Sequence, residues 1–189
     1  LRKGEISGLK FGDFDPQNRT IYIQRQITSN PIVPKGASKI QSYEVIEKPP
    51  KTDNSYRLLR IPEAVAKEIE KRKILVEANK QQYGEQYFDH GYISCQENGL
   101  PHSTAAMNSA LTKLCSRNGL PHITVHGLRH MYATILIEQK VPLIKISALL
   151  GHASVNTTFE YYCEVMDVNE QIITFMNHTF IPEGGASIC

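Results

Sequence analysis

Tryptophan is absent from this chain of 189 residues, and cysteine occurs only four times. Cys95, Cys115, Cys163 and Cys189 form no C-x-x-C pair and no even spacing, so neither a zinc site nor a disulfide framework is indicated. Long apolar runs are missing, and the first residues lack the basic-then-apolar character of a signal peptide. These absences predict a soluble protein of a reducing cytoplasm.

A strong charge of one sign is missing too, because the formal net charge is only +2 at pH 7. The positive charge is concentrated early: residues 1–60 hold 11 basic and 6 acidic side chains, whereas residues 126–189 hold 3 and 6. A basic N-terminal third can follow the phosphates of DNA, since affinity for DNA comes largely from such contacts. A solvated sheet edge, where lysines guard against aggregation, is the alternative.

The length suits one domain with one core, and the segment pattern predicts an α+β protein that is mostly helical with a small three-stranded antiparallel sheet. Alternating apolar residues predict strands at 20–27, 42–47 and 56–61. Between them, we expect an exposed loop at 29–38 and a tight turn at 51–55.

Capping residues and helical periodicity predict the remaining elements. Ser103 and Thr124 are the expected N-caps of two helices, and the second helix should turn Met131, Ile135 and Leu136 toward the core. The predicted helices cover residues 1–10, 62–81, 103–117, 125–139, 143–150 and 155–165, followed by an amphipathic tail at 167–180.

The residues with the clearest chemistry lie in the last third of the chain. His126 and Arg129 belong to His-Gly-Leu-Arg-His, His152 closes Leu-Leu-Gly-His, and Tyr162 follows ten residues later. A planar guanidinium pairs two phosphate oxygens, an imidazole exchanges protons near neutral pH, and a phenol can hold a phosphoryl group covalently. Such a set can bind a phosphodiester and attack it.

Two motifs near the start extend this set. Arg2 lies in Leu-Arg-Lys-Gly-Glu-Ile, with Glu5 three residues later, and Lys51 lies in Lys-Thr-Asp-Asn-Ser. The order Arg, Lys, His-x-x-Arg, His, Tyr resembles that of the tyrosine recombinase, or phage integrase, family, and the resemblance covers nearly the whole chain. It implies the catalytic domain of such an enzyme over residues 1–189, truncated at its N-terminus, with the upstream core-binding and arm-binding domains absent.

The resemblance implies how the phosphate would be held. Arg2 and Arg129 would bind the scissile phosphate, and His152 would donate to a nonbridging oxygen. A buried structural ion pair is the ordinary interpretation of either arginine alone, but the shared order of the motifs favours the phosphate. The resemblance also implies that no cofactor, metal ion or ATP is required, because a covalent link to the protein would store the energy of the broken bond.

The remaining roles concern bond breaking. Tyr162 would attack the phosphate and form a 3′-phosphotyrosine, His126 would assist as a base or a hydrogen-bond donor, and Lys51 would protonate the departing 5′ oxygen. Tyr161 competes for the role of nucleophile, because related enzymes place the tyrosine nine or ten residues after the second histidine. The similarity of the segment from Tyr162 to Val165 to the family's Tyr-x-His-Val ending favours Tyr162.

A metal site is the main rival interpretation of the histidines. His126 and His130 stand four residues apart on one predicted helix, as in H-E-x-x-H zinc proteases. Gly127 takes the position of the water-activating glutamate, and Arg129 would set a fixed cation beside the metal. We therefore expect no metal, with His130 either packed in the fold or supporting the residues that contact the phosphate.

The resemblance also implies partners and a setting. It implies double-stranded DNA, a homotetramer on that DNA, accessory DNA-bending or excision factors, and a bacterial phage or conjugative transposon. The tail at 167–180 would pack on its own core or exchange with a neighbouring subunit. Two other functions stay open: a type IB topoisomerase, against which the Gly-His152 motif and the tail argue, and a catalytically inactive DNA-binding module.

Overall fold

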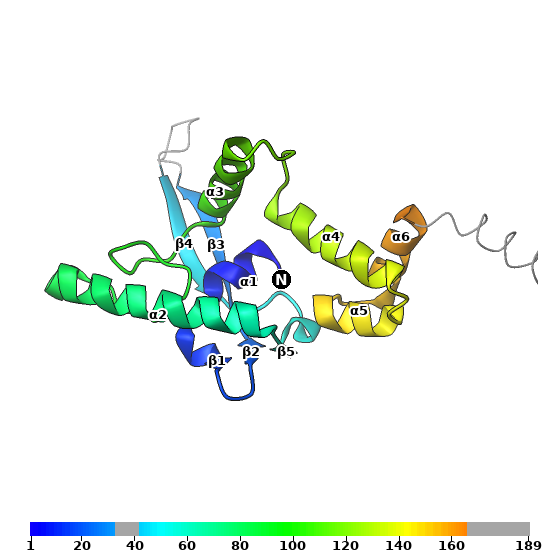
Figure 1. Cartoon of the computed structure of the whole chain (residues 1–189), viewed down its shortest axis with the longest axis horizontal. Coiled ribbons are helices and arrows are strands. Elements are labelled where there is room, and N and C mark those ends of the chain that lie inside the picture. The colour runs from blue at the N-terminus through cyan, green and yellow to red at the C-terminus, as the bar shows by residue number, and fades with distance from the viewer. Residues whose placement is uncertain (33–41, 166–189) are drawn as a thin grey trace, which may run out of the picture.

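The computed structural model describes residues 1–32 and 42–165, and of positions 31, 42, 43 and 161–165 it describes the backbone alone. No helix in these ranges is long and apolar enough to cross a membrane. The elements in chain order (Figure 1), with short 3-10 helices marked η, are α1 (Lys3–Gly8), η1 (Phe11–Asp13), β1 (Phe14–Asp15), β2 (Thr20–Ile23), β3 (Gln26–Ile32), β4 (Ser42–Lys48), η2 (Asp53–Ser55), β5 (Arg57–Arg60), α2 (Glu63–Tyr83), η3 (Gly84–Gln86), α3 (Thr104–Arg117), α4 (Val125–Glu138), α5 (Leu143–Leu150) and α6 (Val155–Val165).

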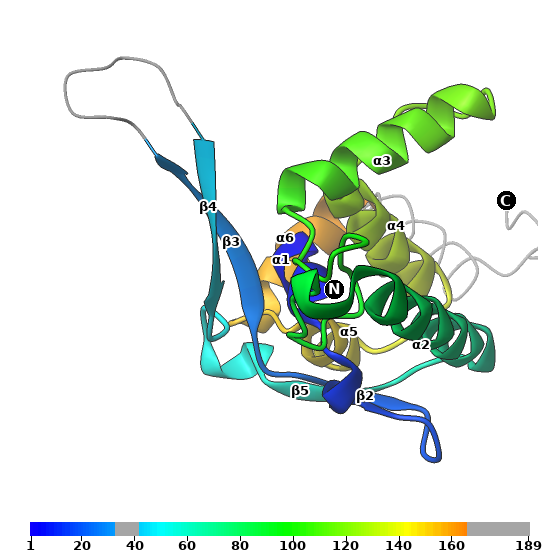
Figure 2. The ribbon, with the colours of Figure 1, turned by 90° about the vertical axis from the view of Figure 1, so that its left-hand side faces the viewer.

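The predicted mostly helical fold with a small antiparallel sheet is confirmed, but the strands pair differently from the prediction. The expected strand at 20–27 is two strands, because the chain bends where Gln24 and Arg25 both bind the carboxylate of Asp13. Before the bend, β2 pairs with β1 and β5 in a three-stranded sheet; after it, β3 pairs with β4 in a separate ribbon. This ribbon projects away from the helices (Figure 2).

The strand pairing corrects two further predictions. β3 continues to Ile32, which pairs with Ser42, so positions 29–32 are strand and not loop, while positions 33–38 lie outside the described residues. The turn at 51–55 joins β4 to β5, which belong to different sheets. The turn that carries Lys51 therefore does not join two strands of one sheet, as the predicted three-stranded sheet required.

Helix α1 packs against β3 with the two backbones in contact. A Cβ atom at Gly4 would lie 2.8 Å from the carbonyl oxygen of Ile27, and one at Gly8 would lie 3.1 Å from the carbonyl oxygen of Arg25. These positions are one helical turn apart, and only glycine permits so close an approach. The contact fixes α1, and with it the N-cap residue Arg2, against the ribbon.

The buried apolar residues fall into separate groups. Two of them join the strands to α2 and to the segment that follows it, and a third joins α4 to α5. The core members are Leu9, Ile21, Ile23 and Ile69 in the first group, Ile27, Val76, Tyr92 and Cys95 in the second, and Ala133, Ile137, Ile146 and Leu150 in the third. The α4–α5 pair thus has a core of its own, and the two helices lie side by side in Figure 1.

Local capping signals are confirmed. The Ser103 hydroxyl accepts a hydrogen bond from the backbone N–H of Ala106 at 3.2 Å, and the Thr124 hydroxyl accepts one from Gly127 at 3.0 Å. The helix predicted at 143–150 ends at Gly151, which is left-handed with φ 67°. The tail predicted at 167–180 lies outside the described residues.

The predicted inward face of α4 is wrong for Met131 and Ile135, whereas Leu136 packs against the core that joins α4 to α5, as predicted. Met131 and Ile135 are 49% and 48% exposed. The buried positions of this helix repeat every four residues, at Arg129, Ala133 and Ile137. Residues at that spacing share one helix face, so a buried Arg129 turns Met131 and Ile135 outward.

Candidate active site

A cleft of about 380 Å³ opens where the N-terminus of α1 meets α4, the end of α5 and α6. Its walls carry four of the six residues predicted from the sequence, namely Arg2, His126, Arg129 and His152. Segments from the start and from the last third of the chain therefore share one space. The other lining residues are His130, Ala133, Leu150, Thr157, Thr158 and Glu160.

Arg129 is the most deeply buried cation of the cleft, at 7% exposure. Its Nη2 donates to the carbonyl oxygen of Leu150 at 2.7 Å, whereas its Nη1 is buried and has no hydrogen-bond partner among the described residues. Burial, followed by the charge of Arg2, lowers the pKa of Arg129 to about 10, so the group stays charged at neutral pH. A buried donor without a partner is costly, and an anion in the cleft would satisfy it.

Arg2 approaches the same place from α1. Its Nη2 donates to the carbonyl oxygen of Gly151 at 2.8 Å, and its Nη1 donates to Glu5 at 2.9 Å and to the Ser55 hydroxyl at 3.2 Å. Burial by itself would raise the pKa of the Glu5 carboxyl, but hydrogen bonds from Arg57 and Arg2 outweigh it and hold that pKa below its usual value. Glu5 therefore stays ionised and orients Arg2.

Three arginines meet at the C-terminus of α5, and we call them the arginine junction. The last carbonyls of a helix lack intrahelical partners and carry partial negative charge. Each arginine of the junction donates to one of three consecutive carbonyls: Arg57 to Leu149 at 3.0 Å, Arg129 to Leu150 at 2.7 Å and Arg2 to Gly151 at 2.8 Å. The helix end thus aligns cations from α1, β5 and α4.

Gly151 leaves room for this junction, which gives a first testable prediction. A Cβ at Gly151 would lie 2.8 Å from Nη1 of Arg57 and 3.2 Å from the carbonyl oxygen of Asn54. We expect Gly151→Ala to lower the free energy of unfolding by about 2–4 kcal/mol, because a left-handed alanine and the clash both cost. Urea denaturation measures this loss.

Gly119 provides the matched control. It is also left-handed, with φ 63°, but a Cβ there would meet nothing within 4 Å. Gly119→Ala should therefore lower the free energy of unfolding only by the cost of a left-handed alanine, about 1–2 kcal/mol. Equal losses in the two variants would contradict the steric role assigned to Gly151.

The two histidines of the cleft are held in different ways. Nδ1 of His152 lies 2.8 Å from the hydroxyl of Thr158, which is fully buried. Burial, then the charges of Arg129 and Arg2, lower the pKa of His152 to about 4. The ring of His126 stacks edge to face on that of His130 at 4.3 Å, and burial and these neighbours lower the pKa of His126 as well. Both imidazoles are therefore neutral at pH 7.

A second prediction concerns pH. As the pH falls from 6.5 toward 4, His152 becomes protonated in the unfolded chain but not in the folded chain. The contribution of His152 to the free energy of unfolding is therefore fully present above pH 6.5 and is lost as the pH falls toward 4. We expect the urea midpoint to fall between pH 7 and pH 5, and to fall less in His152→Gln. The control His122→Gln, at an exposed position, should keep the wild-type dependence. An unchanged dependence in His152→Gln would contradict the prediction.

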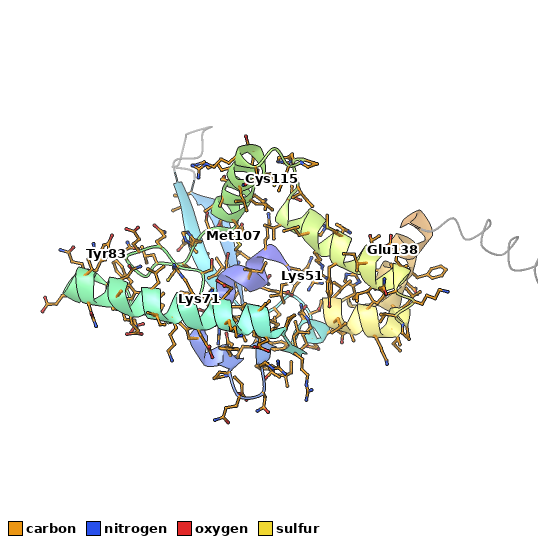
Figure 3. All side chains as sticks on the ribbon, viewed as in Figure 1. Lys51, Lys71, Tyr83, Met107, Cys115 and Glu138 are labelled. Atoms are coloured by element: carbon orange, nitrogen blue, oxygen red, sulfur yellow. The ribbon has the colours of Figure 1, made fainter. Side chains whose placement is uncertain are left out.

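Lys51 is the predicted residue that the structure does not bring to the cleft. It is exposed in the turn between β4 and β5, and Figure 3 shows it between α1 and the α4–α5 pair in that view. The turn is held beside the site, because the side chain of Asn54 donates a hydrogen bond to the carbonyl oxygen of Ala153 at 3.1 Å. Within the turn, the hydroxyls of Thr52 and Ser55 are hydrogen-bonded to each other at 3.0 Å. Lys51 thus lies on a short segment whose far end is anchored.

The two candidate tyrosines are placed only by their backbone. Positions 161 and 162 both lie in α6, and their side chains are outside the described part of the chain. The choice of Tyr162 therefore stays a prediction. Among the described side chains, no group of three or more His, Cys, Asp or Glu lies close enough to hold a metal ion.

Sequence reasoning missed Arg57, Asn54 and Thr158, which support the site without belonging to the motifs. Arg57 follows the Lys-Thr-Asp-Asn-Ser motif by two residues, and Asn54 lies within the motif. Thr158 stands six residues after His152. Their nearness in the sequence to a motif residue was the only available signal, because the partners of all three are set by the fold.

Comparison with known proteins agrees with this geometry. Residues 1–168 match the phage integrase family. The chain belongs to this family. Because the match includes both the segment of Arg2 and the segment of the two tyrosines, it spans all the elements that line the cleft.

Individual relatives of this integrase-family chain extend further than it does. It is 31% identical over 185 residues to the "Tyrosine recombinase XerC-like" of Caldanaerobacter subterraneus, which covers 96% of this chain and 47% of that protein. It is 29% identical over 169 residues to the integrase of Staphylococcus phage L54a, covering 88% and 45%. The chain thus spans about half the length of the curated relatives it matches.

A solved structure shares the fold. The Tn1549 transposon integrase, in complex with transposon right end DNA, matches with a TM-score of 0.69 at 20% identity, over 95% of this chain and 55% of that one. At this identity the likeness concerns the fold alone. The mostly helical architecture with its small antiparallel sheet is therefore that of tyrosine recombinase catalytic domains.

Proposed function

We propose that this chain cuts and rejoins double-stranded DNA at specific sites through a 3′-phosphotyrosine, in the integration or excision of a phage or conjugative transposon. The observation that carries the proposal is the meeting of Arg2 and Arg129. They come from α1 and α4, donate to adjacent carbonyls at the end of α5, and line one cleft.

The charge of this place suits a phosphodiester. The arginine junction contains three guanidinium groups and contacts one buried carboxylate, Glu5, which leaves an excess of positive charge. Attack on a phosphodiester adds negative charge to its nonbridging oxygens, and donors fixed in advance toward that charge are usually the largest catalytic effect. The unpartnered Nη1 of Arg129 and the neutral His152 would supply such donors.

The nucleophile is Tyr161 or Tyr162 of α6. The similarity of the segment from Tyr162 to Val165 to the family's Tyr-x-His-Val ending favours Tyr162. Thr157 and Thr158 of the same helix line the cleft, so the helix that carries both candidates borders the site. We therefore place Tyr162 first and test both.

Proton transfers complete the proposed reaction. His126 is neutral at pH 7 and lines the cleft, so it can accept the phenol proton or donate to the phosphate. Lys51 would protonate the departing 5′ oxygen, which requires its turn to approach the cleft on the DNA. The phosphotyrosine keeps the energy of the broken bond, so a second strand's 5′ hydroxyl can reverse the step without ATP or metal.

The proposed partners follow from the same chemistry. Strand exchange between two DNA duplexes needs one active site per cut strand, which a homotetramer would provide. The Tn1549 integrase was solved in complex with transposon DNA, which supports DNA as the partner of this chain. Accessory DNA-bending or excision factors would set the direction of the reaction.

A covalent trapping experiment tests the proposal. The full-length protein is incubated with nicked duplexes of random sequence, adducts are isolated under denaturing conditions, and the trapped DNA is sequenced. A nick near the scissile phosphate lets the 5′ hydroxyl fragment diffuse away, so the phosphotyrosine accumulates. We expect adducts that are enriched in one sequence.

The other outcomes identify the alternatives. Binding of DNA without any adduct would show an inactive DNA-binding module and overturn the proposal. Adducts without sequence enrichment, together with relaxation of supercoiled plasmid by the chain alone, would indicate topoisomerase-like activity.

A further inference from the structure

We propose that Arg57 is a positioning residue that holds the two halves of the phosphate site in register. This inference rests on the proposed function and assigns a role to a residue outside the predicted catalytic set. One half of the site, with Arg2, belongs to the part of the fold built on the strands, and the other half, with Arg129 and His152, belongs to the α4–α5–α6 part. Arg57 bonds to both.

The contacts of Arg57 use every nitrogen of its guanidinium. Nη1 and Nη2 donate to the two oxygens of Glu5 at 3.2 and 2.9 Å, Nη1 also donates to the carbonyl oxygen of Ser55 at 2.8 Å, and Nε donates to that of Leu149 at 3.0 Å. The side chain is only 8% exposed, and that of Glu5 only 2%. Four of the five N–H groups of Arg57 are thus used inside the fold.

These contacts connect Arg57 to the reacting phosphate through Arg2. The carboxylate of Glu5 accepts a hydrogen bond from Nη2 of Arg57 and one from Nη1 of Arg2, each at 2.9 Å. Leu149 directly precedes Leu150, whose carbonyl holds Arg129. A shift of α5 relative to β5 would therefore move both phosphate-binding arginines, and Arg57 resists that shift.

Substituting Arg57 by lysine tests the proposal while keeping the charge. A single ammonium cannot reproduce three nitrogens in a fixed fork, so Glu5 and Leu149 would no longer be bridged. We expect the single-turnover rate of adduct formation to fall at least about tenfold, because small misplacements at a reacting centre are costly. Affinity for the same DNA, and its salt dependence, should stay unchanged because the number of charges is the same.

Arg19→Lys is the matched control. Arg19 forms an exposed ion pair with Glu63 at 3.7 Å, and the same substitution there should change neither rate nor affinity. A second experiment combines Arg57→Lys with Arg2→Lys. If Arg57 acts through Arg2, the double variant should form the adduct little more slowly than Arg2→Lys alone.

The outcomes separate this inference from the proposed function. If the wild type forms no adduct, the proposed function fails. If the wild type forms the adduct and Arg57→Lys forms it as fast, only the positioning role is overturned. The positioning role is also overturned if Arg57→Lys slows adduct formation as much in the Arg2→Lys background as in the wild type. It is overturned as well if Arg57→Lys weakens DNA affinity and leaves the rate unchanged.

An unfolded variant would form no adduct for a trivial reason. Circular dichroism therefore first establishes that the wild type and Arg57→Lys are both folded at the assay temperature. Glu5→Gln serves as the second variant, because it keeps the volume and one acceptor oxygen of the same pair. It should slow adduct formation in the same direction as Arg57→Lys. A wild-type rate in folded Glu5→Gln would equally contradict the proposed linkage.

Discussion

We expect a Tyr162→Phe chain to form no covalent adduct with the nicked duplex, while Tyr161→Phe forms it at close to the wild-type rate. Phenylalanine lacks the attacking oxygen but keeps the ring, so a loss of the adduct at one position reports chemistry and not packing. The measurement is the fraction of labelled DNA that migrates with the protein under denaturing conditions. Both variants should bind the intact duplex as the wild type does.

The opposite result has a definite meaning. An adduct that survives in Tyr162→Phe and disappears in Tyr161→Phe would contradict the choice made from the sequence motif and identify Tyr161 as the nucleophile. Loss in both single variants would show that one ring orients the other. An adduct in the double variant would exclude both tyrosines as nucleophiles.

Arg129→Gln should separate catalysis from stability more sharply than any other change in the cleft. We expect adduct formation to slow by at least about 10²–10³-fold, since a preorganised donor to the developing charge is lost. The free energy of unfolding should change by no more than about 1 kcal/mol, because the charge that is removed is desolvated and lies close to the like charge of Arg2. Single-turnover kinetics and urea denaturation measure the two quantities.

The reason lies in the contacts of Arg129. Within the described part of the chain its side chain donates one hydrogen bond, to the carbonyl oxygen of Leu150, and it lies close enough to Arg2 for that charge to lower its pKa. Arg117→Gln, at an exposed position in the last turn of α3, is the control and should leave both quantities near wild type. A loss of several kcal/mol in Arg129→Gln would mark Arg129 as a structural residue and weaken the proposed phosphate site.

Local signals accounted for most of the helices. Ser103, Thr124 and Gly151 act on backbone groups within a few residues of themselves, so their effect can be predicted without knowing the rest of the fold. The family resemblance was equally accessible, because it depends on the order of short motifs along the chain. Four of the six predicted residues then proved to line one cleft.

Pairing and burial could not be predicted in the same way. The bend between β2 and β3 depends on Asp13, which binds side chains 11 and 12 residues further along. The inward face of α4 depends on Arg129, whose burial is made possible by a carbonyl at the end of another helix. Apolar residues such as Met131 were assigned to the core only because hydrophobicity was the sole guide.

The positions of the helices and the set of chemical groups follow from the amino-acid order, since capping, periodicity and motif order are properties of neighbouring residues. The meeting of Arg2, Arg57 and Arg129 at the end of α5 follows from the folded chain alone, because a helix terminus offers its unpaired carbonyls to whichever donors the fold brings there. The proposed phosphate site is a product of that convergence.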